Sequence, residues 1–230
     1  MCTQDKTNFK GIIFDMDGTM VDNMMIHHRA WQQKLAQLGL PMSLEEVKAK
    51  VHGVNLEILE RLFGDRFTPE ERQRISFEKE EAYRQIYKPN LKLLPGLRPL
   101  LDQLKAANIP MAIGTAAPPE NADFILDTLQ LRSYFSTVLH SDSVTKGKPH
   151  PEIFIKAAQG LGLNAQECLV FEDSLTGAET ALNASCPAII VTTTHAQEEF
   201  AAFPHIRRFI SNYLDIDLQY LQNEFNFKNN

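Results

Sequence analysis

Five short apolar runs limit the folds open to this chain more than any other feature of its sequence. They read KGIIF, MAIGT, TVLH, CLVF and AIIVT, at residues 10–14, 111–115, 137–140, 168–171 and 188–192. Uninterrupted apolar runs of this length are typical of parallel strands buried on both faces. The segments between the later runs have the length of crossover helices. We therefore expect an α/β fold with a Rossmann-like parallel sheet.

A long stretch after the first run breaks this rhythm. Residues 22–91 show amphipathic helical patterns and no convincing strand, with capping signatures in SLEE at 43–46 and TPEE at 68–71. We expect residues 1–21 and 92–230 to form an α/β core and residues 22–91 an α-helical cap. Such an insertion emerges beside the carboxyl ends of the strands, where ligands bind in open α/β sheets, so it would make a lid.

Charge and composition narrow the classes of partner. The 230 residues carry 23 basic and 29 acidic side chains, a net charge of −6, which gives no basic surface for nucleic acid or an anionic membrane. No apolar run is long enough to span a bilayer. Cys2, Cys168 and Cys186 form no CxxC or Cys/His cluster and are interpreted as reduced thiols. We expect a cytoplasmic, monomeric protein that acts on a small molecule.

The sharpest local feature is the sequence DMDGT, which directly follows the first apolar run. Asp15 and Asp17 are two residues apart and Gly18 turns the chain after them, so both carboxylates can point at one place. Such a pair suits a cation together with nucleophilic or acid/base chemistry. A calcium loop that starts at Asp15 would need glycine at position 6 and glutamate at position 12. Here Gly18 is at position 4 and Ile26 at position 12, so a calcium loop is excluded. A surface Asp-Gly turn is the remaining alternative.

Polar residues also follow the later strands, at the same predicted edge of the sheet. Thr115 and Ala116 follow the second, Lys148 the third, and Glu172 and Asp173 the fourth. Together with DMDGT they place acids, a hydroxyl and a base around one crevice. That set of groups suits a phosphate and Mg²⁺.

At this point the motifs resemble a known family. The order DMDGT, IGT, KGKPHP and FEDS resembles the four motifs of the haloacid dehalogenase superfamily, and the helical insertion resembles its α-helical cap subclass. The resemblance covers nearly the whole chain. Asp22, residues 27–31 and residues 148–151 are similar to the β-phosphoglucomutase-like subgroup, which includes sugar-phosphate phosphatases.

The resemblance implies a role for each motif residue. Asp15 would attack phosphorus to form an aspartyl-phosphate, and Asp17 would serve as the general acid and base. Mg²⁺ would bind the Asp15 carboxylate, the Asp17 backbone carbonyl and Asp173. Glu172 would be either a further ligand or a residue that contacts the ligands. The phosphoryl oxygens would be held by Thr115 and Lys148, and by backbone amides after Asp15 and at Gly18 and Ala116.

Asp17 also favours an ester or anhydride of phosphate as the substrate, because only an oxygen leaving group needs an acid. The two leading hypotheses are a phosphatase on a small phosphate ester, preferred here, and an isomerase of the β-phosphoglucomutase type. An isomerase must hold a second phosphate with cationic groups in its cap. Leu56 stands where the mutases place an arginine, and our matching places Gln85 at the position of the cap lysine.

Three further points stay open at the level of sequence. Arg84 or Lys79 could replace the missing cap charge. His27 would assist the acid/base aspartate in a mutase, whereas a helix histidine with no catalytic role is the alternative. A non-catalytic binding module on the same fold is the third functional hypothesis, because a fold alone does not prove activity.

Overall fold

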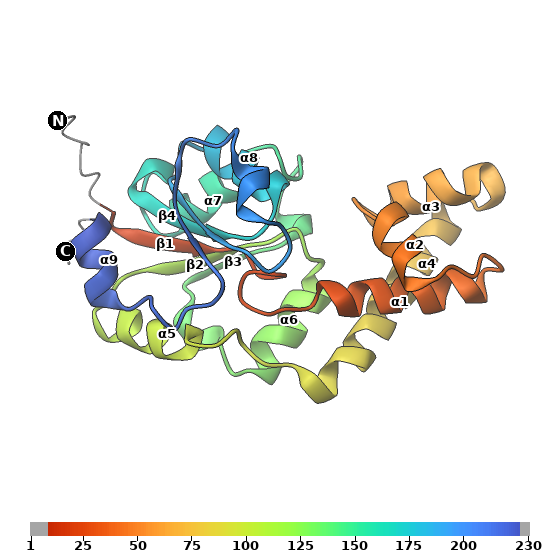
Figure 1. Cartoon of the computed structure of the whole chain (residues 1–230), viewed down its shortest axis with the longest axis horizontal. Coiled ribbons are helices and arrows are strands. Elements are labelled where there is room, and N and C mark those ends of the chain that lie inside the picture. The colour runs from red at the N-terminus through yellow and green to blue at the C-terminus, as the bar shows by residue number, and fades with distance from the viewer. Residues whose placement is uncertain (1–8, 226–230) are drawn as a thin grey trace. The chain divides into compact units, whose positions relative to one another are not determined.

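The computed structural model describes residues 9–225, and its larger part is built on one parallel sheet (Figure 1). The sheet has six strands in the order β3-β2-β1-β4-β5-β6, and every neighbouring pair is parallel. The strands are β1 Gly11–Phe14, β2 Met111–Gly114, β3 Thr137–Leu139, β4 Cys168–Glu172, β5 Ala188–Val191 and β6 Ile206–Ile210. The predicted α/β fold is confirmed, and five of these strands lie where the apolar runs predict them.

Strand β6 was not expected, because its sequence IRRFI lacks a continuous apolar run. It lies at the edge of the sheet and pairs only with β5. Charged side chains are common on edge strands, where they discourage pairing with other chains. Because Arg207 and Arg208 interrupt the apolar pattern, the apolar runs of the sequence do not predict this strand.

Helices cover both faces of the sheet (Figure 1). On one face lie α7 Glu152–Gly160 and α8 Leu175–Asn183, and on the other lie α5 Leu97–Ala106, α6 Pro119–Thr128 and α9 Leu218–Phe225. Side chains of β1, β4, α7 and α8 share one apolar cluster that includes Ile13, Phe154 and Val170. Phe14 stacks on Phe171 with ring centroids 5.0 Å apart. This packing fixes the carboxyl ends of β1 and β4, where the polar motifs begin.

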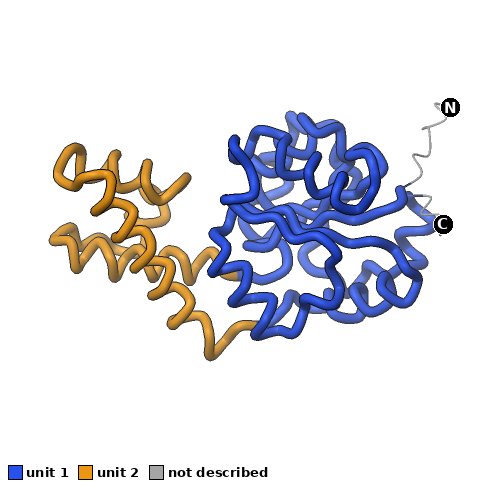
Figure 2. Tube along the Cα trace, turned by 180° about the vertical axis from the view of Figure 1, so that it is seen from behind, with its two compact units in different colours: residues 1–22, 92–230 blue, residues 23–91 orange. Residues whose placement is uncertain are grey.

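Residues 23–91 form a second compact unit, and residues up to 22 and from 92 form the first (Figure 2). The second unit consists of α1 Met24–Gln37, α2 Leu44–Lys50, α3 Asn55–Phe63 and α4 Pro69–Tyr87. Its core packs Trp31 and Leu35 of α1 against Val47, Leu59 and Ile75.

Both predicted capping boxes are confirmed in this unit. The Ser43 and Thr68 side chains accept hydrogen bonds from the backbone N–H groups of Glu46 and Glu71, and each glutamate accepts one in return.

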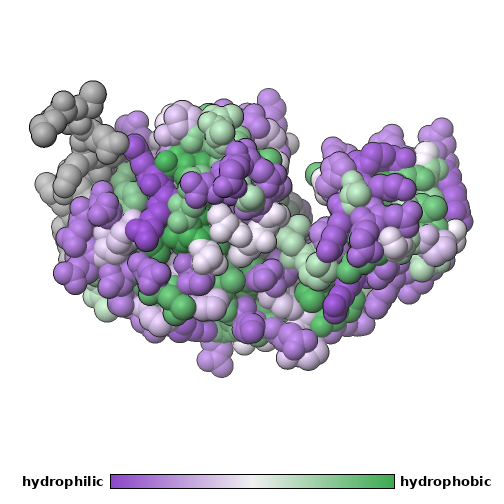
Figure 3. All heavy atoms as spheres, viewed as in Figure 1, coloured by the Kyte–Doolittle hydropathy of each residue, from purple (hydrophilic) through white to green (hydrophobic). Residues whose placement is uncertain are grey.

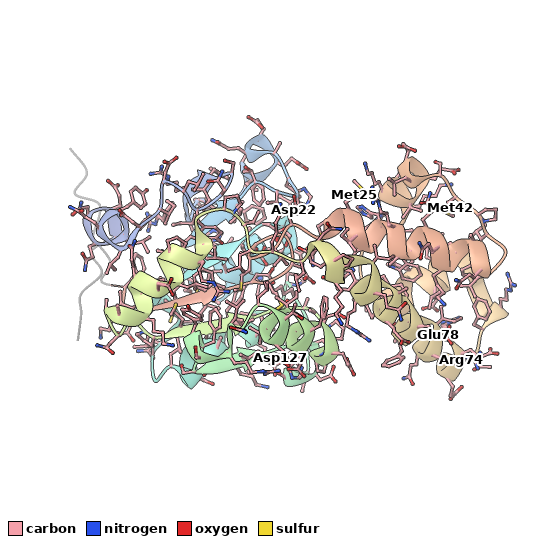
Figure 4. The ribbon with its side chains drawn as sticks, turned by 90° about the horizontal axis from the view of Figure 1, so that it is seen from below. Asp22, Met25, Met42, Arg74, Glu78 and Asp127 are labelled. Carbon is pink, nitrogen blue, oxygen red and sulfur yellow. The ribbon has the colours of Figure 1, made fainter. Side chains whose placement is uncertain are left out.

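An ion-pair network links α1 and α4 within the second unit. Glu78 lies one turn after Arg74 on α4 (Figure 4), and their charged groups are 3.8 Å apart. The same carboxylate accepts a hydrogen bond from Lys34 of α1 at 3.0 Å. Lys34 is mostly buried, whereas Glu78 is largely exposed, so water screens this pair on one side only.

Hydrophilic residues predominate on the face seen in Figure 3. Among residues 9–225 no helix has the length and apolar character needed to cross a bilayer. Cys168 and Cys186 are buried free thiols, and Cys2 lies outside the described residues.

Candidate active site

The site starts at Asp15, the first residue after β1. Its backbone N–H donates to the carbonyl of Phe171 at 2.9 Å, which extends the pairing of β1 with β4 to this residue. Asp15 is 5% exposed, and its side chain accepts a hydrogen bond from Lys148 Nζ at 2.7 Å. Burial raises the pKa of Asp15 to about 7; the charges of Glu172 and Asp17 add to the rise, and Lys148 opposes it.

Lys148 joins two of the predicted motifs. Its ammonium group also donates to Glu172 Oε1 at 2.6 Å and lies 4.8 Å from the centre of the Phe154 ring. Although burial lowers its pKa, the charges of Asp15 and Glu172 raise the pKa above its usual range. Lys148 is therefore a fixed cation beside the Asp15 carboxylate.

The loop that carries Lys148 is fastened by the first residue of α7. The Glu152 carboxylate accepts hydrogen bonds from the backbone N–H groups of Thr145 and Lys146 and from the Thr145 hydroxyl, at 2.8 to 3.2 Å. These bonds define the path of the chain just before Lys148.

The turn after Asp15 is packed without spare space. Gly18 has a φ of +77°, and a methyl group added there would lie 2.0 Å from Asp173 Oδ2. Asp17 lies in this turn, is half-buried, and pairs in an isolated β-bridge with Val21. A glycine is therefore required at this position both for its backbone conformation and for the close approach of Asp173.

Glu172 is the last residue of β4 and Asp173 follows it, and the two differ in their surroundings. Glu172 Oε2 accepts hydrogen bonds from the backbone N–H groups of Asp173 and Ser174 at 2.7 Å, while Oε1 accepts from Lys148. Asp173 accepts from the hydroxyls of Thr19, at 3.3 Å, and Thr194. Burial, with the charges of Glu172 and Asp15, raises the pKa of Asp173 well above its usual range.

Thr115 lies at the same edge of the sheet, directly after β2. It is buried, its backbone N–H donates to the Leu139 carbonyl at 3.0 Å, and its Oγ1 accepts from the N–H of Ala117 at 3.2 Å. Ala116 is exposed just beyond it. The first unit thus brings Asp15, Asp17, Gly18, Thr115, Ala116, Lys148, Glu172 and Asp173 to one sheet edge.

His27 belongs to the second unit, where it is part of a buried polar cluster. Its ring stacks on Tyr83 with centroids 3.9 Å apart, and its Nδ1 lies 2.9 Å from Lys79 Nζ. Lys79 is 2% exposed and donates to Glu80 at 2.8 Å. Although burial raises the pKa of Glu80, the charges of Lys79 and His27 lower it more, to about 2.

The other candidate cap residues differ from Lys79. Gln85 is exposed on α4, and Arg84 lies with its guanidinium 5.9 Å from the centre of the Phe77 ring. Sequence matching placed Gln85 at the position of the cap lysine, yet the buried cation of this unit beside His27 is Lys79. Lys79 is one of the two residues that the sequence offered as a replacement for the missing cap charge.

The first unit's carboxylates fit a divalent cation. Oxygen atoms of Asp15, Glu172 and Asp173 all lie within 4.8 Å of one another, and all three residues are buried. Lys148 contacts two of the three carboxylates, so negative charge remains in excess when all three are ionised. Oxygen ligands of this kind suit a hard cation such as Mg²⁺.

Sequence reasoning missed several residues that support the site. Thr193 donates to the Gly18 carbonyl, Thr194 to Asp173, and Tyr213 to the Thr19 carbonyl at 3.0 Å. These residues lie up to 194 positions from their partners. The sequence TTT after the fifth apolar run was the available signal, because it occupies the same edge of the sheet as the other motifs.

Comparison with known proteins agrees with this geometry. Residues 9–185 match the family model described as haloacid dehalogenase-like hydrolase. The chain is 32% identical over 185 residues to the fructose-1-phosphate phosphatase YqaB of Escherichia coli. The aligned region covers 80% of this chain and 96% of that protein. The chain is 31% identical to the β-phosphoglucomutase of Bacillus subtilis, over 78% of this chain and 82% of that one. A crystal structure of a HAD hydrolase, family IA, variant 3, from Entamoeba histolytica has a TM-score of 0.86 at 26% identity and covers 95% and 100% of the two chains.

Proposed function

Because this chain belongs to the haloacid dehalogenase-like hydrolases and is a phosphoryl-transfer enzyme, we propose that it is a Mg²⁺-dependent phosphatase that hydrolyses a small phosphate ester through a phosphoenzyme on Asp15. The observation that carries the proposal is the buried Asp15 carboxylate at the end of β1, hydrogen-bonded to Lys148 at 2.7 Å and followed two residues later by Asp17. A buried carboxylate beside a fixed cation has the features of a nucleophile for phosphorus.

Two displacements account for hydrolysis. In the first, a carboxylate oxygen of Asp15 forms a bond to phosphorus, the ester P–O bond breaks, and Asp17 gives its proton to the departing oxygen. In the second, a water oxygen attacks phosphorus while Asp17 takes a proton from that water. The bond from Asp15 to phosphorus then breaks, which restores the Asp15 carboxylate and the protonated Asp17 and releases inorganic phosphate.

Positioning groups complete this chemistry. The Lys148 ammonium group lies beside Asp15 and would also neutralise charge on the transferring phosphoryl group. The Thr115 hydroxyl accepts its hydrogen bond from Ala117, so its own proton can be donated to a phosphoryl oxygen. The backbone N–H groups of Gly18 and Ala116 are further candidates for phosphate contacts, although Gly18 N–H also donates to the Val21 carbonyl at 2.8 Å.

The residues that would hold Mg²⁺ are the Asp15 and Asp173 carboxylates and the Asp17 backbone carbonyl. When bound, the cation would supply positive charge that lets an anionic carboxylate approach an anionic phosphate. Glu172 accepts hydrogen bonds from the Lys148 ammonium group and from the backbone N–H groups of Asp173 and Ser174, so we assign it the role of fixing Lys148 and Asp173.

A sugar phosphate is the substrate class that the relatives favour, because the E. coli relative acts on fructose 1-phosphate. We further propose that residues 23–91 form the cap, whose surface selects the leaving group. The experiment is a panel of hexose and other small phosphate esters, with phosphate release measured with and without Mg²⁺. Release should depend on Mg²⁺ and disappear in Asp15→Asn; release that persists in this variant would contradict the mechanism.

An isomerase of the β-phosphoglucomutase type is the second candidate, favoured by the 31% identity to the B. subtilis enzyme. Against it, Leu56 stands at the position of the mutase arginine, and Lys79 is already paired with Glu80. The two candidates separate when β-glucose 1-phosphate is supplied with a catalytic amount of glucose 1,6-bisphosphate. Rapid formation of glucose 6-phosphate with little free phosphate would favour the isomerase.

A further inference from the structure

Both carboxylate oxygens of Asp173 accept hydrogen bonds from hydroxyl groups. Oδ1 accepts from Thr19 Oγ1 at 3.3 Å, and Oδ2 accepts from Thr194 Oγ1. Asp173 is 3% exposed, so protein hydroxyls rather than bulk water surround these oxygens. The rotation of this carboxylate about its last bond is therefore set by two threonines.

Thr194 lies in the segment between β5 and β6 and contacts Asp173 from there. The sequence predicted no site residue in this segment. The preceding residue, Thr193, donates to the carbonyl of Gly18. Two consecutive hydroxyls of one segment thus hold both sides of the proposed cation site, the DMDGT turn and Asp173. Gly18 lies close to both Asp173 and Thr194. A methyl group added at Gly18 would lie 2.0 Å from Asp173 Oδ2 and 3.0 Å from Thr194 Oγ1.

The geometry points to Thr194 as a positioning residue that orients the Asp173 carboxylate toward the divalent cation. This inference rests on the proposed function, in which Asp173 is a ligand of Mg²⁺. A threonine hydroxyl has a single proton, and here the carboxylate receives it. One oxygen is thereby held against the β5–β6 segment, and the carboxylate keeps one orientation relative to Asp15. Groups that orient a metal ligand in this way commonly change metal affinity by about 10-fold to 100-fold when they are removed.

The same segment offers a matched control. The Thr192 hydroxyl donates to the Ile210 carbonyl at 3.2 Å, so it joins β5 to β6 and contacts neither Asp173 nor the DMDGT turn through that bond. Thr192→Val and Thr194→Val both replace one hydroxyl by a methyl group, at positions two residues apart. Only the second removes a bond to the proposed cation ligand.

Mg²⁺ binding to the substrate-free protein, measured by isothermal titration calorimetry, tests the inference without relying on turnover. Thr194→Val should weaken Mg²⁺ binding by about 10-fold or more, while Thr192→Val should bind as the wild type does. Thr194→Ser keeps the hydroxyl and should restore binding to within a few-fold. The Mg²⁺ concentration for half-maximal phosphate release should shift in parallel, with a smaller change in kcat at saturating Mg²⁺.

The outcomes separate this inference from the proposed function. If the wild type is active and a folded Thr194→Val protein binds Mg²⁺ as tightly as the wild type does, the role of Thr194 alone is overturned. A wild type that neither binds Mg²⁺ nor releases phosphate would overturn the proposed function and this role with it. Should circular dichroism show that Thr194→Val does not fold, Thr194→Ala compared with Thr194→Ser gives the same contrast.

Discussion

At the scale of single residues, the protonation of Asp15 should control how stable the protein is without a cation. Its pKa is about 7 in the folded chain and 3.8 when unperturbed, with burial as the main cause. Between these values the folded state carries a proton that the unfolded state lacks, so stability falls as pH rises. The full difference is on the order of a few kcal/mol.

We therefore predict that, in EDTA, the free energy of unfolding of the wild type falls between about pH 4 and 7 relative to Asp15→Asn. Urea denaturation of both proteins at several pH values measures this difference. Asparagine does not ionise, so the variant removes the titration of Asp15 together with the charge by which Asp15 raises the pKa of Asp173. Parallel pH profiles for the two proteins would contradict the buried, partly protonated Asp15.

Gly18 permits a second prediction at this scale. Gly18 and Gly39 both have positive φ values, +77° and +82°, but an added methyl group at Gly39 would meet nothing within 4 Å. Gly39→Ala should lower the free energy of unfolding by about 1–2 kcal/mol, the cost of the left-handed backbone. Gly18→Ala should lose about 1–3 kcal/mol more, because the methyl group collides with Asp173.

Thermal and urea denaturation of the two alanine variants provide the measurement, and phosphate release provides an independent check. Gly18→Ala should lose most of its activity, since Asp173 must move, whereas Gly39→Ala should keep it. Equal losses of stability at the two glycines, with activity intact in both, would show that Asp173 can move away at little cost.

Which site residues could be predicted from the sequence depends on where they lie in it. Asp15, Thr115, Lys148 and Asp173 each follow an apolar run, and parallel strands bring such positions to one edge. Thr194 follows the fifth run in the same manner, but a hydroxyl in TTT has no distinctive chemistry until its partner is known. Tyr213 follows the edge strand that the sequence did not reveal.

At the scale of elements, the loop between β3 and α7 should depend on Glu152 for its shape. Glu152 accepts hydrogen bonds from the backbone of Thr145 and Lys146, and hydrogen bonds from Lys156 and Thr145 lower its pKa to about 2. The carboxylate is therefore ionised at any pH near neutrality. Because the loop leads directly to Lys148, a change in its path should reach the active site.

Glu152→Ala should reduce kcat/KM for phosphate release by about 10-fold, as small displacements of a positioning group do. Lys156→Ala is the comparison, since it leaves the bonds from Glu152 to the loop backbone but removes the ion pair with Glu152 at 2.6 Å and a hydrogen bond to the Ser143 carbonyl at 2.9 Å. Steady-state kinetics on both variants separate the bonds made by Glu152 from the contacts made by Lys156. A loss in Lys156→Ala as large as that in Glu152→Ala would contradict a specific role for the bonds from Glu152 to Thr145 and Lys146.

At the scale of the whole molecule, the chain carries a separate apolar core in each of its two units. Trp31, Leu35 and Leu59 belong to one core, and Ile13 and Phe154 belong to the other. The sequence predicts a boundary near residue 22, because helical periodicity and capping replace the strand pattern there. How the two units lie together is not encoded in those patterns, since periodicity reports only which face of an element is buried.

Two matched substitutions, each of which creates a cavity in one core, test whether the two units are destabilised separately. Leu59 of α3 and Leu104 of α5 are both fully buried, and Leu→Ala at such positions costs about 2–5 kcal/mol. Leu59→Ala should raise amide hydrogen exchange within residues 23–91 and leave β1 and β4 protected, because their packing partners are in the first unit. Leu104→Ala should raise exchange around the sheet instead. Mass spectrometry of exchanged peptides resolves the two patterns, and an equal rise throughout the chain in either variant would mean that both cores unfold in one cooperative step.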